Sequence, residues 1–149
     1  MDRILALDYG DRRVGVAVSD PLGYTAQGLP TIIYQKLPEL LNKLSSLIEK
    51  WRIRQLLVGI PLTMNGQEGG RAEITKGFVQ ELKRKFHLPV VLWDERLSST
   101  EAKKIAVKLG IKTGYNKQQI DRIAAVLILQ GYLDSQQERY KSDKMDDKS

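Results

Sequence analysis

The pattern of apolar and polar residues predicts strands early in the chain and helices later. Two short apolar runs, 3–8 and 13–19, are rich in β-branched residues and are joined by the tight polar connection 10–12, which is typical of a hairpin. Glycine and proline interrupt the loop 20–30, and a short third strand is expected at 31–34. The chain is therefore predicted to begin with three consecutive antiparallel strands.

The rest of the chain alternates between helical and extended patterns. Helices are expected at about 38–51, 71–86, 98–110 and 117–133, and strands at 55–60 and 89–93. In the second helix, the buried face is expected to consist of Ile74, Phe78, Leu82 and Phe86. Helical connections favour parallel pairing of the later strands. We therefore expect an α/β fold, a mixed five-stranded sheet flanked by helices, with the first strand central and flanked by the two later strands.

Length and composition indicate one domain followed by a polar tail. The chain has 149 residues, enough to bury a core in a single domain, which we place at 1–134. Residues 135–149 are polar and carry as many acidic as basic side chains, so we expect them to be disordered. Cysteine is absent, which excludes disulfides and a cysteine nucleophile and suits a reducing cytoplasm. No apolar run is long enough to span a membrane, so a cytoplasmic location is expected.

The excess of basic residues lies in the predicted domain. The chain carries a formal net charge of +6, and the neutral tail contributes none of it. Because a basic surface attracts phosphates, nucleic acid is the expected partner. The single histidine, His87, lies in a predicted turn between a helix and a strand, which argues against a histidine-based catalytic triad.

Three acidic residues lie on separate apolar elements. Asp8 is near the end of the first strand, Glu95 follows the strand at 89–93, and Asp121 lies in the first turns of the last helix. An acid at the edge of a buried strand loses hydration, for which a metal ion or a strong hydrogen-bond network compensates. Carboxylate oxygens are the ligands that hard divalent ions prefer. Since ligands gather at the carboxyl ends of parallel strands, we expect the three acids to form one metal site.

Each acid also has an ordinary structural explanation. An acid after a strand is typical of a turn, and Asp121 alone would be favourable near the positive end of its helix. Glu95 is also suited to a solvated ion pair with Arg96 or Arg71. The occurrence of all three acids on three apolar elements favours the metal site.

Four stretches of the chain carry a resemblance to a known family: 7–10 continuing through 13–21, 58–62 with Gly69 and Arg71, 93–98, and 120–121 followed by 124–130. Together they resemble the bacterial pre-16S rRNA nuclease family, also called Holliday junction resolvase-like, of the ribonuclease H-like superfamily. The resemblance extends in order over residues 3–134. It implies a ribonuclease H-like fold and assigns the family's three acidic positions, catalytic and metal-binding, to Asp8, Glu95 and Asp121.

The resemblance further implies a metal-dependent endonuclease that hydrolyses phosphodiester bonds in 5′-end maturation of precursor 16S ribosomal RNA, a step of ribosome biogenesis. The implied cofactor is Mg²⁺ or Mn²⁺, with two ions expected. The implied partners are precursor rRNA, ribosomal particles and branched DNA, without a membrane. The expected substrate-binding side chains are Arg13, Arg71, Arg96, Ser98, Ser99, Lys112 and Lys117. Ion pairing is the alternative for each arginine, and helix capping for Ser98.

The chain departs from the family at the basic run that commonly precedes the last acid. Only Lys112 and Lys117 lie there, which puts the strength of the substrate grip in doubt rather than the cleavage chemistry.

Three other functions remain open from these residues. A Holliday junction resolvase acting on DNA would use the same chemistry. A non-catalytic nucleic-acid-binding or transcription-linked factor would keep the fold and tolerate neutralisation of Asp8. The turn at 8–10 also resembles the first phosphate loop of the actin-like and sugar-kinase superfamily, whose members include ATP-binding phosphotransferases. The chain is too short for the duplicated second domain of those proteins.

Overall fold

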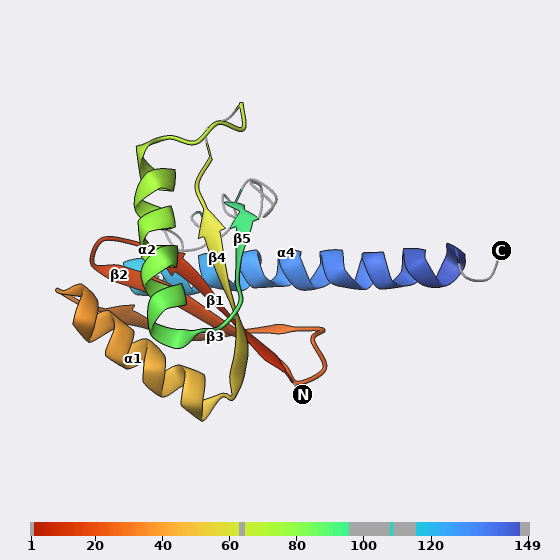
Figure 1. The fold of residues 1–149 in the computed structure, drawn as a ribbon, viewed down its shortest axis with the longest axis horizontal. Coiled ribbons are helices and arrows are strands. Elements are labelled where there is room, and N and C mark those ends of the chain that lie inside the picture. Colours follow the sequence, from red (N-terminus) through yellow and green to blue (C-terminus); the bar gives the residue numbers. More distant parts are fainter. Residues whose placement is uncertain (1, 63–64, 96–107, 109–115, 147–149) are drawn as a thin grey trace.

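A computed structural model describes residues 2–62, 65–95, 108 and 116–146 of the chain (Figure 1). Its strands form one mixed sheet in the order β3-β2-β1-β4-β5, which confirms the predicted five-stranded α/β architecture. The strands are β1 (Arg3–Tyr9), β2 (Arg13–Ser19), β3 (Ala26–Ile33), β4 (Ile53–Ile60) and β5 (Val90–Asp94). The helices are α1 (Leu37–Lys50), α2 (Gly70–Phe86) and α4 (Lys117–Asp146).

Strand β1 occupies the centre of the sheet. It pairs antiparallel with β2 through the tight hairpin and parallel with β4, and β5 extends the sheet parallel to β4. The expectation that both later strands would flank the first was therefore wrong for β5. The hairpin partner β2 takes one edge of β1, so only one edge remains for a parallel strand.

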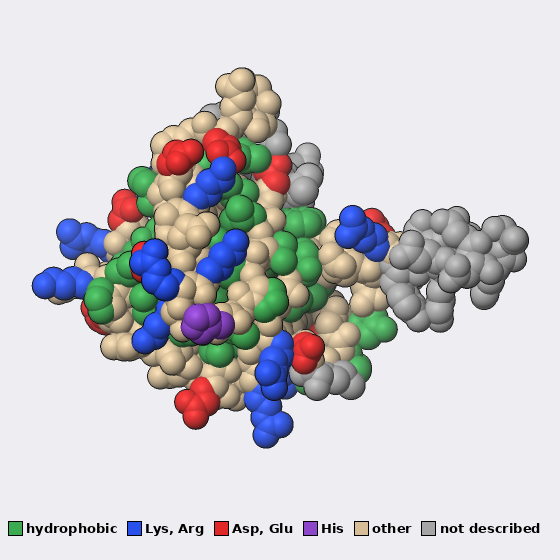
Figure 2. Space-filling view, in the orientation of Figure 1, with side chains coloured by type: hydrophobic (Ala, Val, Ile, Leu, Met, Phe, Trp, Pro, Cys, Tyr) green, Lys and Arg blue, Asp and Glu red, His purple; other side chains and the backbone are tan. Residues whose placement is uncertain are grey.

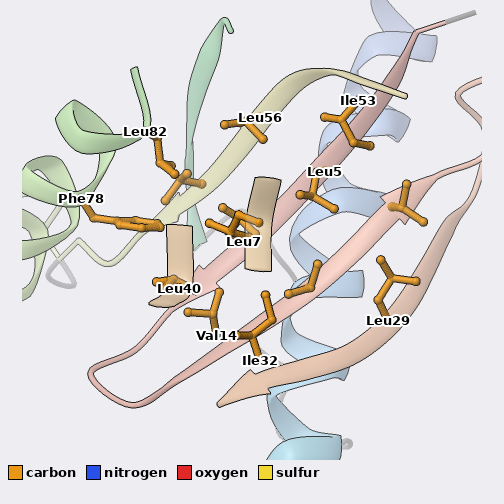
Figure 3. Close-up of a cluster of buried hydrophobic side chains, with 14 of the residues drawn as sticks. Leu5, Leu7, Val14, Leu29, Ile32, Leu40, Ile53, Leu56, Phe78 and Leu82 are labelled. Carbon is orange, nitrogen blue, oxygen red and sulfur yellow. The ribbon is translucent and has the colours of Figure 1, made fainter. Parts of the chain in front are cut away.

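Helices cover both faces of the sheet (Figure 1). The larger core lies between the sheet and helices α1 and α2, where Leu5 and Leu7 of β1 meet Leu40 and Phe78 (Figure 3). The smaller core lies beneath α4 and includes Ala6 of β1. Because side chains alternate along a strand, the side of β1 that carries Ala6 also carries the acid two residues later. The Asp8 side chain therefore lies on the face of the sheet that α4 covers.

Strand β3 is longer than the sequence predicts. It begins at Ala26 rather than Thr31 and includes Gly28 and Pro30. Both residues are tolerated because β3 is an edge strand, where proline need not donate to a neighbour. A Cβ at Gly28 would lie 2.6 Å from Cγ of Arg122, so glycine makes room for α4 at this position.

Helix α2 buries Phe78 and Leu82 as expected, and Phe86 packs partly buried against the larger core, but Ile74 lies outside the buried face. Ile74 is 49% exposed, and the buried residues are Ala72, Thr75, Phe78, Val79 and Leu82. The expected set was spaced by four residues, and such a row drifts by about 40° per step around a helix of 3.6 residues per turn. The observed face mixes spacings of three and four residues and therefore stays on one side.

Helix α4 extends beyond the predicted domain. It continues to Asp146, so residues 135–146 are helical where a disordered tail was expected, and this part projects past the sheet (Figure 1). The helix expected at 98–110 falls outside the described residues except for Lys108. None of the described helices is both long enough and apolar enough to cross a membrane.

Candidate active site

The three predicted acids belong to the layer between the sheet and α4. Asp8 lies on the same side of β1 as Ala6, which packs against α4. Glu95 directly follows β5 and is partly buried. Asp121 lies one helical turn before Ala125, a fully buried residue of α4 that packs on the same face of the sheet. The topology therefore brings all three acids to one layer.

Two glycines allow the acids to approach the sheet closely. Gly15 on β2 is the register partner of Asp8, and a Cβ there would lie 2.1 Å from the carbonyl oxygen of Asp121. Gly59 lies on β4, the other neighbour of β1, and a Cβ there would lie 2.9 Å from Oε1 of Glu95. Side chains at these positions would push the acids away. Glycine on both flanking strands thus lets Asp121 and Glu95 lie against the strands beside Asp8.

Asp8 and Asp121 line one cavity of about 480 Å³. Its other walls come from the β1–β2 connection and from the first turn of α2. The complete lining is Asp8, Tyr9, Gly10, Asp11, Arg12, Arg13, Arg71 and Asp121. Glu95 lies against Gly59 on β4, outside this lining. Carboxylates and guanidinium groups share the cavity, a combination that suits a cation and a phosphate together.

Arg13 connects β2 to α4 across the cavity. Its Nε donates a 2.7 Å hydrogen bond to Oδ2 of Asp121, and the two side chains are 38% and 24% exposed. The ion pair that the sequence offered as an alternative for Arg13 is therefore present. It orients the Asp121 carboxylate while the Arg13 side chain lines the cavity.

Arg71 joins α2 to the β1–β2 connection. Its Nη1 donates to Oδ1 of Asp11 at 3.0 Å, and its Nη2 donates to the carbonyl oxygen of Tyr9 at 3.3 Å. The Tyr9 ring stacks on Phe78 of α2 with 3.9 Å between ring centroids. These contacts fix the residue after Asp8 and hold a half-exposed cation at the cavity wall.

Tyr34, which follows β3, holds the β1–β2 connection through two hydrogen bonds. Its hydroxyl donates to the carbonyl oxygen of Gly10, and its backbone N–H donates to the carbonyl oxygen of Arg12 at 3.0 Å. Burial, together with a hydrogen bond to Tyr9, raises the pKa of Tyr34, so its hydroxyl stays protonated and can donate. Sequence reasoning missed Tyr34, because no local pattern shows that β3 returns beside the β1–β2 connection.

The other predicted substrate contacts are not brought to the cavity within the described structure. Lys117 is exposed at the first position of α4 and does not line the cavity. Arg96, Ser98, Ser99 and Lys112 lie outside the described residues.

The fit of the acids to a metal ion rests on their chemistry and on the space around them. Among the residues that the structure describes, no group of three or more Asp, Glu, His or Cys side chains is arranged as a metal site. The three acids nevertheless offer only carboxylate oxygens, the donors that Mg²⁺ and Mn²⁺ prefer. Gly15 and Gly59 leave room for two of them beside Asp8. The residues therefore fit a divalent cation.

Comparison with known proteins identifies the family. The RuvX family model, described as Holliday junction resolvase, matches residues 2–135. A protein of Desulforamulus reducens named "Putative pre-16S rRNA nuclease" is 44% identical over 133 residues, which cover 89% of this chain and 97% of that protein. A protein of the same name from Halothermothrix orenii is 46% identical over 134 residues, covering 90% and 96%.

Solved structures of resolvases share the fold. RuvC of T. thermophilus, in complex with a Holliday junction substrate, matches with a TM-score of 0.56 at 13% identity, over 89% of this chain and 94% of that one. The fowlpox virus resolvase, in complex with Holliday junction DNA, matches with a TM-score of 0.56 at 12% identity, over 89% and 97%. These likenesses confirm the ribonuclease H-like fold. By sequence, the chain belongs to the RuvX family, as its resemblance to the pre-16S rRNA nucleases predicted.

Proposed function

We propose that this protein is a metal-dependent endonuclease that hydrolyses phosphodiester bonds in 5′-end maturation of precursor 16S rRNA. The observation that carries the proposal is the cavity that Asp8 and Asp121 line together with Arg13 and Arg71, while Glu95 lies against Gly59 of the neighbouring strand β4. Relatives named for pre-16S rRNA nuclease activity support the substrate class. A cavity that combines carboxylates with arginines, in a basic domain, also suits phosphodiester hydrolysis, because basic side chains attract phosphates while carboxylates bind metal.

We assign Asp8, Glu95 and Asp121 as the ligands of Mg²⁺ or Mn²⁺, with two ions as the expected number. When bound, the ions would supply activation of a water nucleophile and stabilisation of the leaving oxygen. The protein contributes the placement of the ligands. Gly15 lets α4 approach β2, and Arg13 orients the Asp121 carboxylate through its 2.7 Å ion pair.

The arginines of the cavity would hold the scissile phosphate. Arg71 is fixed at two points, by the Asp11 carboxylate and by the Tyr9 carbonyl, so little conformational entropy is lost when it binds an anion. Arg13 would contribute a second positive charge. Our candidates for contacts with the rest of the substrate remain the side chains of Arg96, Ser98, Ser99, Lys112 and Lys117.

The proposed partners are precursor rRNA and the ribosomal particles that carry it, and the proposed location is the cytoplasm. A second candidate function is resolution of branched DNA. The description of the matching family model favours it, as do the folds of two resolvases in complex with Holliday junctions. Both functions would use the same acids, so the substrate alone distinguishes them.

A substrate competition tests the proposal. Purified protein with Mg²⁺ or Mn²⁺ is incubated with labelled precursor 16S rRNA and a labelled four-way DNA junction, separately and as competitors. We expect the RNA to be cut near its mature 5′ end, and the junction to compete weakly. Preferential cutting of the junction would establish the resolvase function instead. Binding of either substrate without cleavage at any metal concentration would refute the nuclease proposal in favour of a binding factor.

A further inference from the structure

A second cavity lies away from the acidic site and is lined by basic and aromatic side chains. It has a volume of about 430 Å³ and lies where β1 begins, between the end of α1 and the β2–β3 turn. Its lining residues are Arg3, Pro21, Lys50, Trp51 and Arg52. Figure 2 shows Lys and Arg side chains gathered at the edge of the molecule where the N-terminus lies.

Trp51 positions two of these cations. Cζ of Arg3 lies 5.3 Å from the centroid of the Trp51 ring, and Nζ of Lys50 lies 5.6 Å from it. Both distances are within the range of a cation–π contact, which holds a long flexible side chain against the ring. The ring itself packs partly against the larger core and is therefore a fixed support.

No described acid forms an ion pair with a cation of this cluster. Arg3, Lys50 and Arg52 form none of the ion pairs found among the described residues. The carboxylate of Asp20, next to the lining residue Pro21, instead accepts hydrogen bonds from backbone N–H groups of its own turn. Three cations around one cavity repel one another, and an anion would relieve that repulsion.

Arg52 is kept in the cluster at a backbone cost. Its φ is 54°, in the left-handed region, at the position after a helix where glycine is usual. His87 has the same φ after α2, so this conformation alone does not indicate a site. At Arg52, the left-handed conformation occurs beside a cavity that two further cations, Arg3 and Lys50, also line. A binding role for the arginine would explain why this position does not carry glycine.

We propose that Arg3, Lys50 and Arg52 form a second nucleic-acid contact that binds backbone phosphates of single-stranded RNA, with Trp51 as the positioning residue. Arg3 and Asp8 lie on the same strand, so the two sites are roughly 17 Å apart at about 3.3 Å per residue. A single RNA strand of a few nucleotides would therefore reach from one site to the other. The inference rests on the proposed function in taking RNA as the substrate.

Binding of a labelled single-stranded RNA of about 12 nucleotides, measured by fluorescence anisotropy in EDTA, tests this contact without cleavage. We expect Arg52→Gly to weaken binding several-fold and to reduce the slope of log affinity against log salt by about 0.7. The same variant should melt at or above the parent temperature, because glycine suits the left-handed conformation. Arg54→Gln is the matched control, since it removes one charge from an exposed position of β4 outside the cavity and should leave affinity nearly unchanged.

Trp51→Leu should weaken binding as well, and it should remove most of the change in intrinsic fluorescence on adding RNA. Equal affinities of the parent and Arg52→Gly, or equal losses in Arg52→Gly and Arg54→Gln, would overturn the inference. If RNA cleavage occurs but Arg52→Gly binds like the parent, only this inference fails. If RNA binds through this cavity but is never cut with metal present, only the proposed nuclease function fails.

Discussion

Gly15 offers a sharp test of how the sheet and α4 build the acidic site. A Cβ at this position would lie 2.1 Å from the carbonyl oxygen of Asp121, whereas ordinary contacts of a Cβ begin at 3.4 Å. The contacted atom belongs to the backbone of α4, so no side-chain rotation relieves the clash. In Gly15→Ala, the start of α4 must therefore move from β2 by about 1.3 Å, the difference between these two distances.

The displacement has a cost in stability and a larger one in activity. Overpacking costs about 1–3 kcal/mol, and a backbone clash belongs at the upper end, so we expect a loss of about 3 kcal/mol. For a chain of this length, that loss lowers Tm by about 6 to 12 °C. The variant should still fold, because domain stabilities are about 5–15 kcal/mol. A catalytic carboxylate misplaced by about 1 Å can reduce turnover about 100-fold, and Asp121 moves with the helix.

Thermal unfolding by circular dichroism, combined with initial cleavage rates at 25 °C, measures both effects. Gly77→Ala is the matched control, because Gly77 lies within α2 and a Cβ there meets nothing within 4 Å. It should stabilise the protein by about 0.5–1 kcal/mol and leave cleavage unchanged. If Gly15→Ala has the same Tm as the wild type, the close approach of α4 to β2 is wrong. If the variant is destabilised yet cleaves at the wild-type rate, Asp121 is not a catalytic ligand.

Three further predictions concern substrate grip, the tail and pH. Removing Lys117 should reduce the slope of log affinity against log salt by about 0.7 for single-stranded RNA, and an unchanged slope would remove Lys117 from the interface. Deleting the residues after Asp134 should change Tm by only a few degrees, because Leu133 is the last buried core residue among the described side chains; unfolding would contradict this. Hydrogen bonds from the backbone N–H groups of Thr25, Tyr24 and Leu22 lower the pKa of Asp20 below its ordinary 3.8. The charged form therefore stabilises the fold above about pH 4, so Asp20→Asn should lower Tm at pH 7 and lose this effect as the pH falls below 4; a Tm difference independent of pH would refute it.

Local signals predicted much of the fold. The strand at 13–19 was placed at its observed bounds, and α1 nearly so, because a tight polar connection and Pro38 mark their starts. Strand β3 was misjudged, because Gly28 and Pro30 are read as breaks unless the strand is known to lie at an edge. Which residues pair at an edge depends on the whole sheet and not on the local sequence.

In the candidate site too, local sequence predicted some features, whereas others depend on the packed fold. The carboxyl ends of the strands and the start of the last helix were enough to predict that Asp8 and Asp121 would meet. The partner of Asp121 was not predicted, because Arg13 reaches it from 108 positions away in sequence. Support of Gly10 by the Tyr34 hydroxyl likewise requires the packed fold. Contacts of this kind arise from packing between elements, for which a single sequence carries no local signal.

The most direct test of the central claim compares the wild type with Asp8→Asn on precursor 16S rRNA over increasing Mg²⁺ or Mn²⁺, with binding of the same RNA measured in parallel. We expect the wild type to cleave only when the metal is present. Asp8→Asn should cleave more slowly by orders of magnitude, and so should Glu95→Gln and Asp121→Asn. The dissociation constant for RNA should stay nearly unchanged in all three, because the basic side chains that hold phosphates remain in place. Cleavage by Asp8→Asn at the wild-type rate would contradict the proposed mechanism.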